Sequence, residues 1–135
     1  MSKSQKELVI YRLQRAFETF DDAQLLSQNH KWNSTINRLY YAAFYAVSAL
    51  ILFENQSTFT HNGVKISFSE KFIKTGKIEL AFGKLYSQLF TWRQKGDYDD
   101  LYDFDEQTVI PYLEPVRNLI QKIAEIIHAT LDKTP

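Results

Sequence analysis

The chain has 135 residues, the length of one domain, and 44% of them are hydrophobic, which is enough for a substantial core. Lys plus Arg and Asp plus Glu number 16 each; this zero net charge argues against a protein that holds nucleic acid through a strongly basic overall field, but is compatible with a local basic patch. There is no cysteine, which excludes disulfides and thiolate chemistry. The N-terminus lacks an apolar signal core, and the longest apolar run is too short and too rich in Tyr for a membrane span, so we expect a soluble cytoplasmic protein.

The first half of the chain predicts two long helices. Apolar residues recur with helical period over residues 4–26, and a polar break follows. Asn33 or Ser34 is the expected N-cap of a second helix over residues 35–52. That stretch has no Gly or Pro, and Arg38 is its only charged residue. We therefore expect the second helix to lie at the centre of the fold, covered by the rest of the chain.

The next segments predict a short helix and another long one. The short helix covers residues 63–73, and Gly76 supplies the left-handed conformation that ends it. The longer helix covers residues 77–94 and contains Gly83, which costs about 1 kcal/mol relative to Ala. Close packing against another helix would explain why a glycine is kept there.

A loop over residues 95–104 leads to the last helix. Asp105 is the expected N-cap, and Pro111 and Pro115 predict a kinked start before a regular helix that ends near residue 131. No segment predicts a strand. The expected architecture is all-α, an up-and-down bundle of four long helices plus one short helix in a single domain over residues 1–135. We expect it to form a homodimer through one face.

One edge of the central helix combines aromatic rings with a fixed positive charge. Arg38, Tyr41 and Tyr45 are spaced i, i+3 and i+7 and so share that edge. Such an edge is either a network of side chains held in fixed positions in the core or part of a binding surface. The spacing alone leaves both interpretations open.

A second cluster, TWRQKGDY, closes the predicted fourth helix. Arg93 has the planar guanidinium that matches phosphate oxygens, and Tyr98 offers a hydroxyl and a stacking face. Asp97 would orient Arg93 or act on a proton. The alternative is purely structural: a cation near a helix C-terminus interacts well with the helix dipole, Gly96 caps the helix, and Asp97 pairs with a neighbouring basic residue.

The remaining chemistry is sparse. The sequence contains neither a glycine-rich phosphate loop nor a paired metal-ligand spacing, so we predict no metal and no cofactor. Of the three histidines, His61 heads the short helix and is either a cap-region residue or the titratable group of a site, since imidazole titrates near neutrality. The sequence does not place it beside Arg93.

Three blocks together resemble the signature segments of the HEPN superfamily, closest to its small stand-alone prokaryotic branch. They are RLYYAAFYAVSALI over residues 38–51, HNGVKISFSEKFIKTGKI over residues 61–78 and LYSQLFTWRQKGDY over residues 85–98. The resemblance extends from residue 8 to about residue 127, almost the whole chain.

This resemblance implies a helical bundle like the C-terminal domain of kanamycin nucleotidyltransferase, commonly dimeric. Many members pair with a minimal nucleotidyltransferase as toxin and antitoxin, and many others are metal-independent endoribonucleases. In the ribonuclease members an Arg is followed four to six residues later by a His. Arg93 fits the Arg position, but Asp97 and Tyr98 stand where the His is expected. In the paired systems a Tyr beside this motif accepts AMP, and Tyr98 is the candidate by position.

The resemblance leads to three functional hypotheses. The first is a component of a nucleotidyltransferase-linked toxin–antitoxin or defence module. It would bind RNA or a nucleotide at a cleft around Arg93, Asp97 and Tyr98, and nuclease activity would be weak or absent. The neighbours of this cleft would be Arg38, Tyr41 and His61. The second is a non-catalytic dimeric scaffold for a nucleotidyltransferase partner. The third is a metal-independent endoribonuclease in which His61 supplies the missing imidazole.

Overall fold

Four long helices form the body of the protein in the computed structural model, which describes residues 1–55, 60–98 and 102–132. They are α1 (Lys3–Gln28), α2 (Trp32–Phe53), α4 (Leu80–Tyr98) and α6 (Leu113–Leu131). The shorter elements are α3 (His61–Phe68), its π-helical continuation η1 (Ser69–Ile73), α5 (Glu106–Val109) and the 3-10 turn η2 (Ile110–Tyr112). Strands are absent from the described residues, and the predicted all-α bundle of four long helices with a short one is confirmed.

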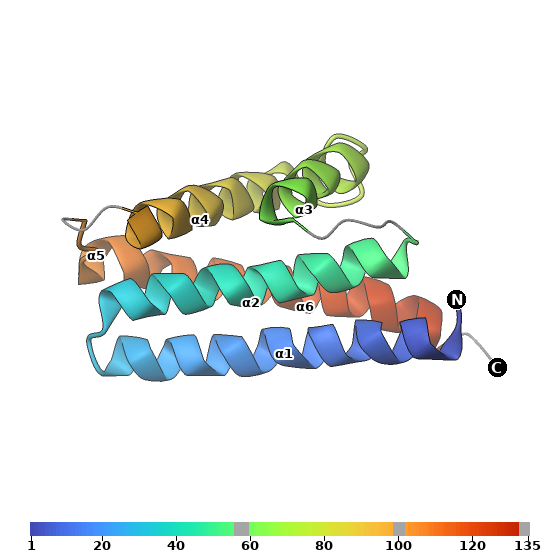
Figure 1. Ribbon diagram of the computed structural model, residues 1–135, viewed down its shortest axis with the longest axis horizontal. Helices are drawn as coiled ribbons and strands as arrows, with labels where there is room; N and C mark the ends of the chain where they lie inside the picture. The colour runs from blue at the N-terminus through green and yellow to red at the C-terminus, as the bar shows by residue number, and fades with distance from the viewer. Residues whose placement is uncertain (56–59, 99–101, 133–135) are drawn as a thin grey trace.

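The long helices run up and down, and α2 lies at their centre. In Figure 1, α1 lies beside α2, α6 passes behind them, and α3 and α4 form a layer above α2. Both chain ends lie at the same end of the bundle (Figure 1). Helix α2 therefore contacts other helices on several sides, which agrees with the expectation that the least charged stretch of the chain is its centre.

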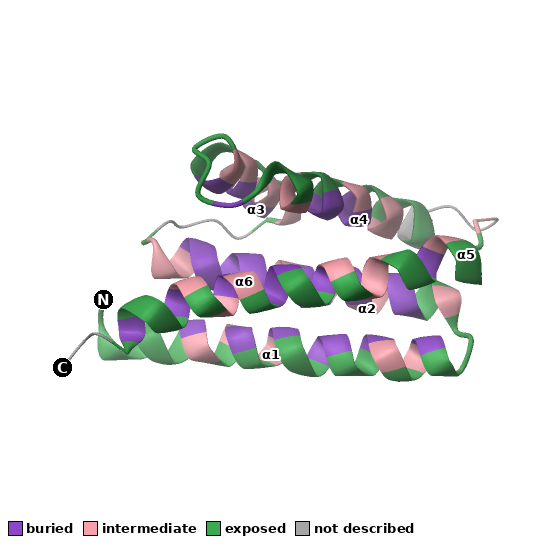
Figure 2. Cartoon of the chain, turned by 180° about the vertical axis from the view of Figure 1, so that it is seen from behind, coloured by how far each residue is buried: buried purple, intermediate pink, exposed green. Residues whose placement is uncertain are grey.

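The core is built around the apolar length of α2. Seen from behind, the buried positions face inward between the helix layers (Figure 2). Among the described residues, α2 alone has the length and apolarity that would suit a membrane span, but 61% of that apolar window is buried inside the protein. A central bundle helix is buried in this way. The apolar composition of α2 is by itself weak evidence for a membrane span.

The start of α2 differs from the prediction. The helix begins at Trp32 instead of residue 35, and neither Asn33 nor Ser34 is its N-cap. Asn33 instead accepts a hydrogen bond from the Phe104 backbone N–H at 2.8 Å, and its amide donates to Asp103 at 3.0 Å. The polar side chain thus ties α2 to the segment before α5, a partner too distant in sequence for a local capping pattern to reveal.

Helix α4 also differs from the prediction at both ends. It starts at Leu80 because Ile78, only 1% exposed, packs into the core in the connection after η1. It ends at Tyr98, so residues 95–98 are helical and not part of a loop. Gly96 lies inside this helix and is therefore not its C-cap. A Cβ built on Gly96 would lie 3.9 Å from the Phe104 ring.

Several local predictions are confirmed. Gly76 has φ of +79°, the left-handed conformation expected after the short helix. The Asp105 side chain accepts from the Thr108 backbone N–H at 2.8 Å and caps α5. The last helix has the expected kinked start, made of α5 and η2 before the regular helix α6. Gly83 faces Ile73 of η1, because a Cβ built there would lie 3.0 Å from the Ile73 side chain.

Candidate functional site

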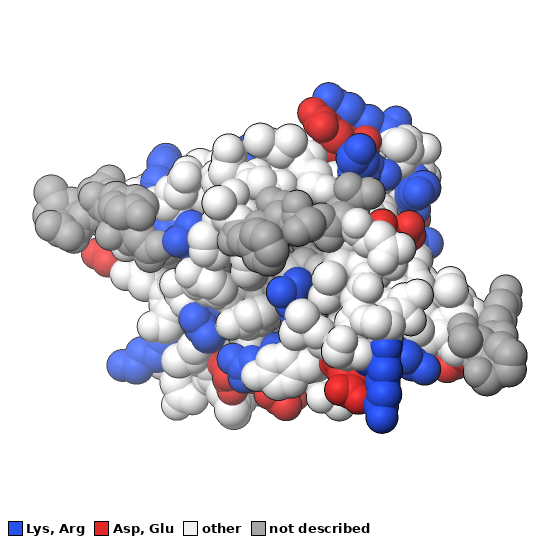
Figure 3. Space-filling model, turned by 45° about the vertical axis from the view of Figure 1, so that its right-hand side comes forward, with Lys and Arg blue, Asp and Glu red and all other residues white. Residues whose placement is uncertain are grey.

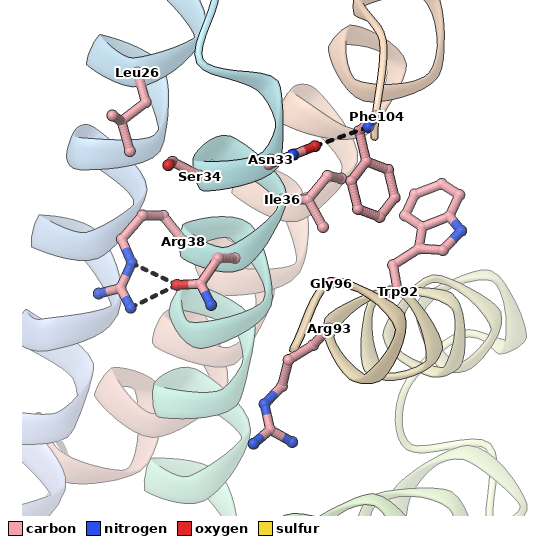
Figure 4. Close-up of a pocket in the computed structure, with 10 residues that line it drawn as sticks. Leu26, Asn33, Ser34, Ile36, Arg38, Trp92, Arg93, Gly96 and Phe104 are labelled. Carbon is pink, nitrogen blue, oxygen red and sulfur yellow. Dashed lines mark hydrogen bonds between the residues drawn. The ribbon is translucent and has the colours of Figure 1, made fainter. Parts of the chain in front are cut away.

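A cleft of about 410 Å³ opens between the N-terminal half of α2 and the C-terminal half of α4. Figure 4 shows Arg38 from α2 and Arg93 from α4 on the two sides of this cleft. The rest of the lining mixes amide and hydroxyl groups with apolar side chains: Leu26, Asn33, Ser34, Ile36, Asn37, Trp92, Gly96 and Phe104. The cleft therefore offers two fixed positive charges, polar donors and aromatic surface in one place.

Both arginines of the cleft stack against the same tyrosine. The Arg38 guanidinium carbon lies 5.1 Å from the centroid of the Tyr41 ring, and that of Arg93 lies 5.8 Å from it. Arg93 also lies over the Tyr40 ring, at 5.4 Å. Contacts between a cation and a ring face are favourable at these distances and leave the edge of the guanidinium able to donate hydrogen bonds.

The Arg38 side chain is held in place by its neighbour. Its Nε and Nη2 both donate to the side-chain oxygen of Asn37, at 3.1 and 2.8 Å (Figure 4). This fork uses one edge of the planar guanidinium and restricts its orientation. A ligand at the cleft would therefore meet a positive charge that is already ordered.

Aromatic packing positions the end of α4 that carries Arg93. The Trp92 ring meets Phe104 edge-on at 5.6 Å and Tyr112 at 4.7 Å. Phe104 is itself tied to α2 through Asn33. These contacts join α4, the segment before α5, and η2, and they fix the side of the cleft from which Arg93 projects.

His61 lies on the other side of the same tyrosine pair. Its Nδ1 is 2.8 Å from the Tyr40 hydroxyl, and its ring lies 5.8 Å from that of Tyr41 and 4.5 Å from that of Phe44. The residue starts α3, whose N-cap Thr60 accepts from the Gly63 backbone N–H at 2.8 Å. The fold thus brings His61 and Arg93, which are far apart in sequence, onto the rings of Tyr40 and Tyr41.

The Tyr40 hydroxyl is part of a buried polar chain. Burial raises the pKa of Tyr40 to about 12, although the neighbouring Tyr86 hydroxyl and the Arg93 charge each lower it somewhat. Burial, and then the Tyr40 hydroxyl, raise the pKa of Tyr86 well above its ordinary value. Tyr86 has no partner of strict hydrogen-bond geometry in the described part of the chain, yet it lies close enough to Tyr40 to affect its pKa. Both hydroxyls keep their protons at neutral pH.

The Tyr40 hydroxyl and Nδ1 of His61 form one hydrogen bond, in which the tautomer of the imidazole decides the donor. With the ring proton on Nδ1, Nε2 can accept a proton, and with the ring proton on Nε2 it is a donor.

Four of the six predicted site residues meet in the structure: Arg38, Tyr41, His61 and Arg93. The other two, Asp97 and Tyr98, belong to the last turn of α4, but their side chains lie outside the described residues. Where the chain is described, no group of three or more metal-ligating side chains gathers. The cleft as described is lined by two guanidiniums, with an imidazole nearby.

Sequence reasoning missed three residues that build the site: Asn37, Tyr40 and Tyr86. A signal existed for Tyr86, because it precedes Arg93 by seven residues and so lies on the same face of α4. Tyr40 is fully buried with a polar tip, and a tyrosine in such a position needs a partner. Its partner could not be named without the placement of α3.

Comparison with known proteins identifies the family. The model of the HEPN domain matches residues 9–128. The chain belongs to the HEPN family. It is 40% identical over 125 residues to a UPF0332 protein of Thermotoga maritima, an alignment that covers 92% of this chain and 95% of that one.

Two archaeal relatives add a coarse functional label to this HEPN chain. It is 30% identical over 98 residues to "Putative toxin MJ0605" of Methanocaldococcus jannaschii, covering 73% of each chain. It is 28% identical over 87 residues to "Putative toxin MJ0142" of the same organism, covering 64% of this chain and 59% of the other. The protein is thus a HEPN-domain protein with toxin-like relatives, and the family resemblance drawn from its three sequence blocks is confirmed.

Proposed function

We propose that this HEPN protein binds RNA through its phosphodiester groups at the cleft between Arg38 and Arg93, as a component of a nucleotidyltransferase-linked toxin–antitoxin or defence module. The observation that carries the proposal is the pair of guanidiniums stacked on the single Tyr41 ring, both lining one cleft. A nucleotide would use the same groups. The relatives named as toxins support a role in such a module.

The chemistry of the cleft suits a phosphate better than a neutral ligand. Guanidiniums donate two parallel hydrogen bonds to phosphate oxygens, and stacking on an aromatic ring orients them without consuming those donors. The zero net charge of the chain does not oppose this, because the positive charge is concentrated locally.

A second candidate is metal-independent RNA cleavage, favoured by the meeting of His61 and Arg93 at the same two rings. The imidazole would take the proton of the ribose 2′ hydroxyl, and the 2′ oxygen would attack phosphorus. The bond to the 5′ oxygen would break, and that oxygen would take a proton from solvent. Arg93 would stabilise the charge of the phosphorane. This role requires an unprotonated Nε2, which the imidazole has when Nδ1 carries the proton and donates it to the Tyr40 oxygen.

Binding and cleavage are separated by one set of variants. Fluorescence anisotropy of a labelled single-stranded RNA would compare wild type, Arg38→Gln, Arg93→Gln and the control Arg117→Gln. Arg117 carries the same charge on α6, where it lies over Phe20 at 5.5 Å. A hydrogen bond to a charged group contributes about 1.5–3 kcal/mol, so Arg38→Gln and Arg93→Gln should each weaken binding about 10- to 100-fold. Unchanged affinity in Arg93→Gln would refute the proposal.

The cleavage assay uses the same proteins, freed of any co-purified nucleotidyltransferase, with EDTA present, and adds His61→Ala. Binding without cleavage by wild type supports the first function. Cleavage that is lost in both Arg93→Gln and His61→Ala supports the second. If the wild-type protein neither binds nor cleaves RNA, the non-catalytic scaffold for a nucleotidyltransferase becomes the assignment. Co-purification with such a partner would test it.

A further inference from the structure

A second groove, of about 460 Å³, lies farther along the same edge of α2. It is formed where α1 and the start of α3 meet α2, and two arginines of α1, Arg12 and Arg15, line it together with Tyr11, Tyr45 and Ser48. Like the cleft, it combines guanidiniums with tyrosine rings. The function proposed above does not use any of these residues.

Both arginines of this second groove contact α2. The Arg15 guanidinium lies over the Tyr45 ring at 5.3 Å, and Arg12 reaches across to the Ser48 backbone oxygen at 3.4 Å. Ser48 is only 7% exposed, so it belongs to the wall of the groove. The two guanidiniums of the groove are the groups that an anionic ligand would bind.

One acidic group competes for this site. Glu18 pairs with Arg15 at 3.3 Å, but the two side chains are 65% and 37% exposed. Exposed ion pairs of this kind contribute little, typically about 0–1 kcal/mol. A phosphate could therefore replace Glu18 as the partner of Arg15 at small cost.

The groove and the cleft are joined along α2. Arg38, Tyr41, Tyr45 and Ser48 follow one another at i, i+3, i+7 and i+10, so they form a single stripe about 15 Å long at a rise of ~1.5 Å per residue. The rings of Tyr41 and Tyr45 lie 6.3 Å apart within it. At both ends of this aromatic pair a guanidinium covers a ring face. Figure 3 shows basic side chains set among uncharged surface across the middle of the molecule, with most acidic ones toward the edges.

We propose that the Arg12–Arg15 groove is a second phosphate and base subsite, so that the ligand is a stretch of single-stranded RNA running along α2 and not a mononucleotide. This inference rests on the function proposed above and specifies its substrate. Alternating guanidiniums and stacking rings along one track is the arrangement that proteins use to hold single strands without reading their sequence. In a double helix the bases pair and stack with each other, so none would be available to stack on a tyrosine ring.

The test compares a dinucleotide with an oligouridylate of about eight nucleotides as fluorescent probes. The variants are the double Arg12→Gln/Arg15→Gln, the single Arg93→Gln and the control Arg117→Gln. We expect the double variant to bind the longer probe about tenfold more weakly and the dinucleotide as wild type does, whereas Arg93→Gln weakens both. Each phosphate contact to a single strand contributes about 0.7 to the slope of log K against log salt, so the double variant should lose about 1.4 from that slope.

Far-UV circular dichroism checks that each variant is folded. A second double variant, Arg12→Lys/Arg15→Lys, keeps the charge and should keep most of the slope of log K against log salt. If the Gln double variant binds the longer probe with wild-type affinity and slope while Arg93→Gln loses both probes, the second subsite is refuted and the proposed function stands. If wild type binds neither probe, both are refuted. The molecular mass of the protein in solution is a further readout. If the Gln double variant changes that mass but not the salt dependence of RNA affinity, the groove is a protein interface and the inference fails.

Discussion

The two faces of α2 bury different kinds of side chain, and the difference separates the part of the protein that holds the fold from the part that offers chemistry. One face carries fully buried small or aliphatic residues: Ala42, Ala43, Ala46, Ala49 and Leu50. The other carries Tyr40, Tyr41, Phe44 and Tyr45, whose rings meet side chains of α1, α3 and α4. Small residues let neighbouring helix backbones approach closely, whereas large rings with polar tips keep helices apart and bring hydroxyls inside.

The aromatic face therefore combines packing with polarity. Tyr40 fills core volume with its ring and connects Tyr86 to His61 through its hydroxyl. The same rings hold the guanidiniums of Arg38 and Arg93 in the cleft. A substitution on the small-residue face should change stability and leave ligand binding intact, while one on the aromatic face should change both.

The largest effect is expected from a cavity on the small-residue face. Leu50→Ala removes a side chain that is 0% exposed, and such truncations cost about 2–5 kcal/mol. Urea denaturation would measure the loss, and RNA affinity of the folded fraction should not change. Leu25→Ala is the control, because Leu25 is 59% exposed and should cost less than about 0.5 kcal/mol. Equal losses for the two variants would contradict the contrast.

A smaller effect, with its own pH dependence, is expected from Tyr40→Phe on the aromatic face. The variant keeps the ring but leaves His61 and Tyr86 without the hydroxyl between them, which costs about 1–3 kcal/mol at neutral pH. RNA binding should also weaken, because His61 loses the contact that orients it. Tyr11→Phe, at a residue 57% exposed, is the matched control for stability; Tyr11 lines the Arg12–Arg15 groove and so is not a control for RNA binding.

The pH dependence follows from the raised pKa of Tyr40, which is about 12 in the folded protein against 10.0 ordinarily. The fold favours the protonated hydroxyl, so this contribution is complete below pH 10 and is lost as the pH rises from 10 toward 12. Unfolding free energy measured over that range should fall more steeply for wild type than for Tyr40→Phe. The difference in slope approaches about 1.4 kcal/mol per pH unit, the value for one proton. Parallel slopes would show that the Tyr40 hydroxyl is not buried in the fold.

The same contrast explains what the sequence could predict. Helical periodicity and local rules were sufficient for the bundle, for the left-handed Gly76 and for the Asp105 cap, because each depends on residues close in sequence. Residue chemistry singled out Arg38 and Arg93, and the structure places both in the lining of one cleft. What it could not supply was any feature whose partner lies on another helix.

Two particular residues illustrate that limit. Asn33 has the chemistry of an N-cap but bonds the backbone of Phe104, 71 residues away. His61 was expected as a cap residue or as the titratable group of a site, without a position beside Arg93. Its contact with Tyr40 depends on how α3 lies over α2. Both outcomes are decided by tertiary packing, which no window of the sequence contains.

The smallest expected effect tests the two glycines of α4 against each other. Gly83 is the fourth residue of α4 and Gly96 lies two residues before its end, so replacing either by Ala gains at most about 1 kcal/mol in helix propensity. At Gly83 the new Cβ would lie 3.0 Å from two atoms of Ile73, whereas at Gly96 its nearest neighbour is the Phe104 ring at 3.9 Å. Gly96→Ala should therefore stabilise by up to about 1 kcal/mol, while Gly83→Ala should be neutral or destabilising by about 1 kcal/mol because η1 must shift.

A double variant shows whether the contact between α4 and η1 is the reason for that difference. In the background of Ile73→Ala the crowding is removed, so Gly83→Ala should recover its helix-propensity gain and stabilise by about 0.5–1 kcal/mol. Thermal and urea unfolding of the four proteins in the cycle would measure the coupling. If Gly83→Ala stabilises the wild-type background as much as Gly96→Ala does, the close approach of η1 to α4 is not what keeps glycine at position 83.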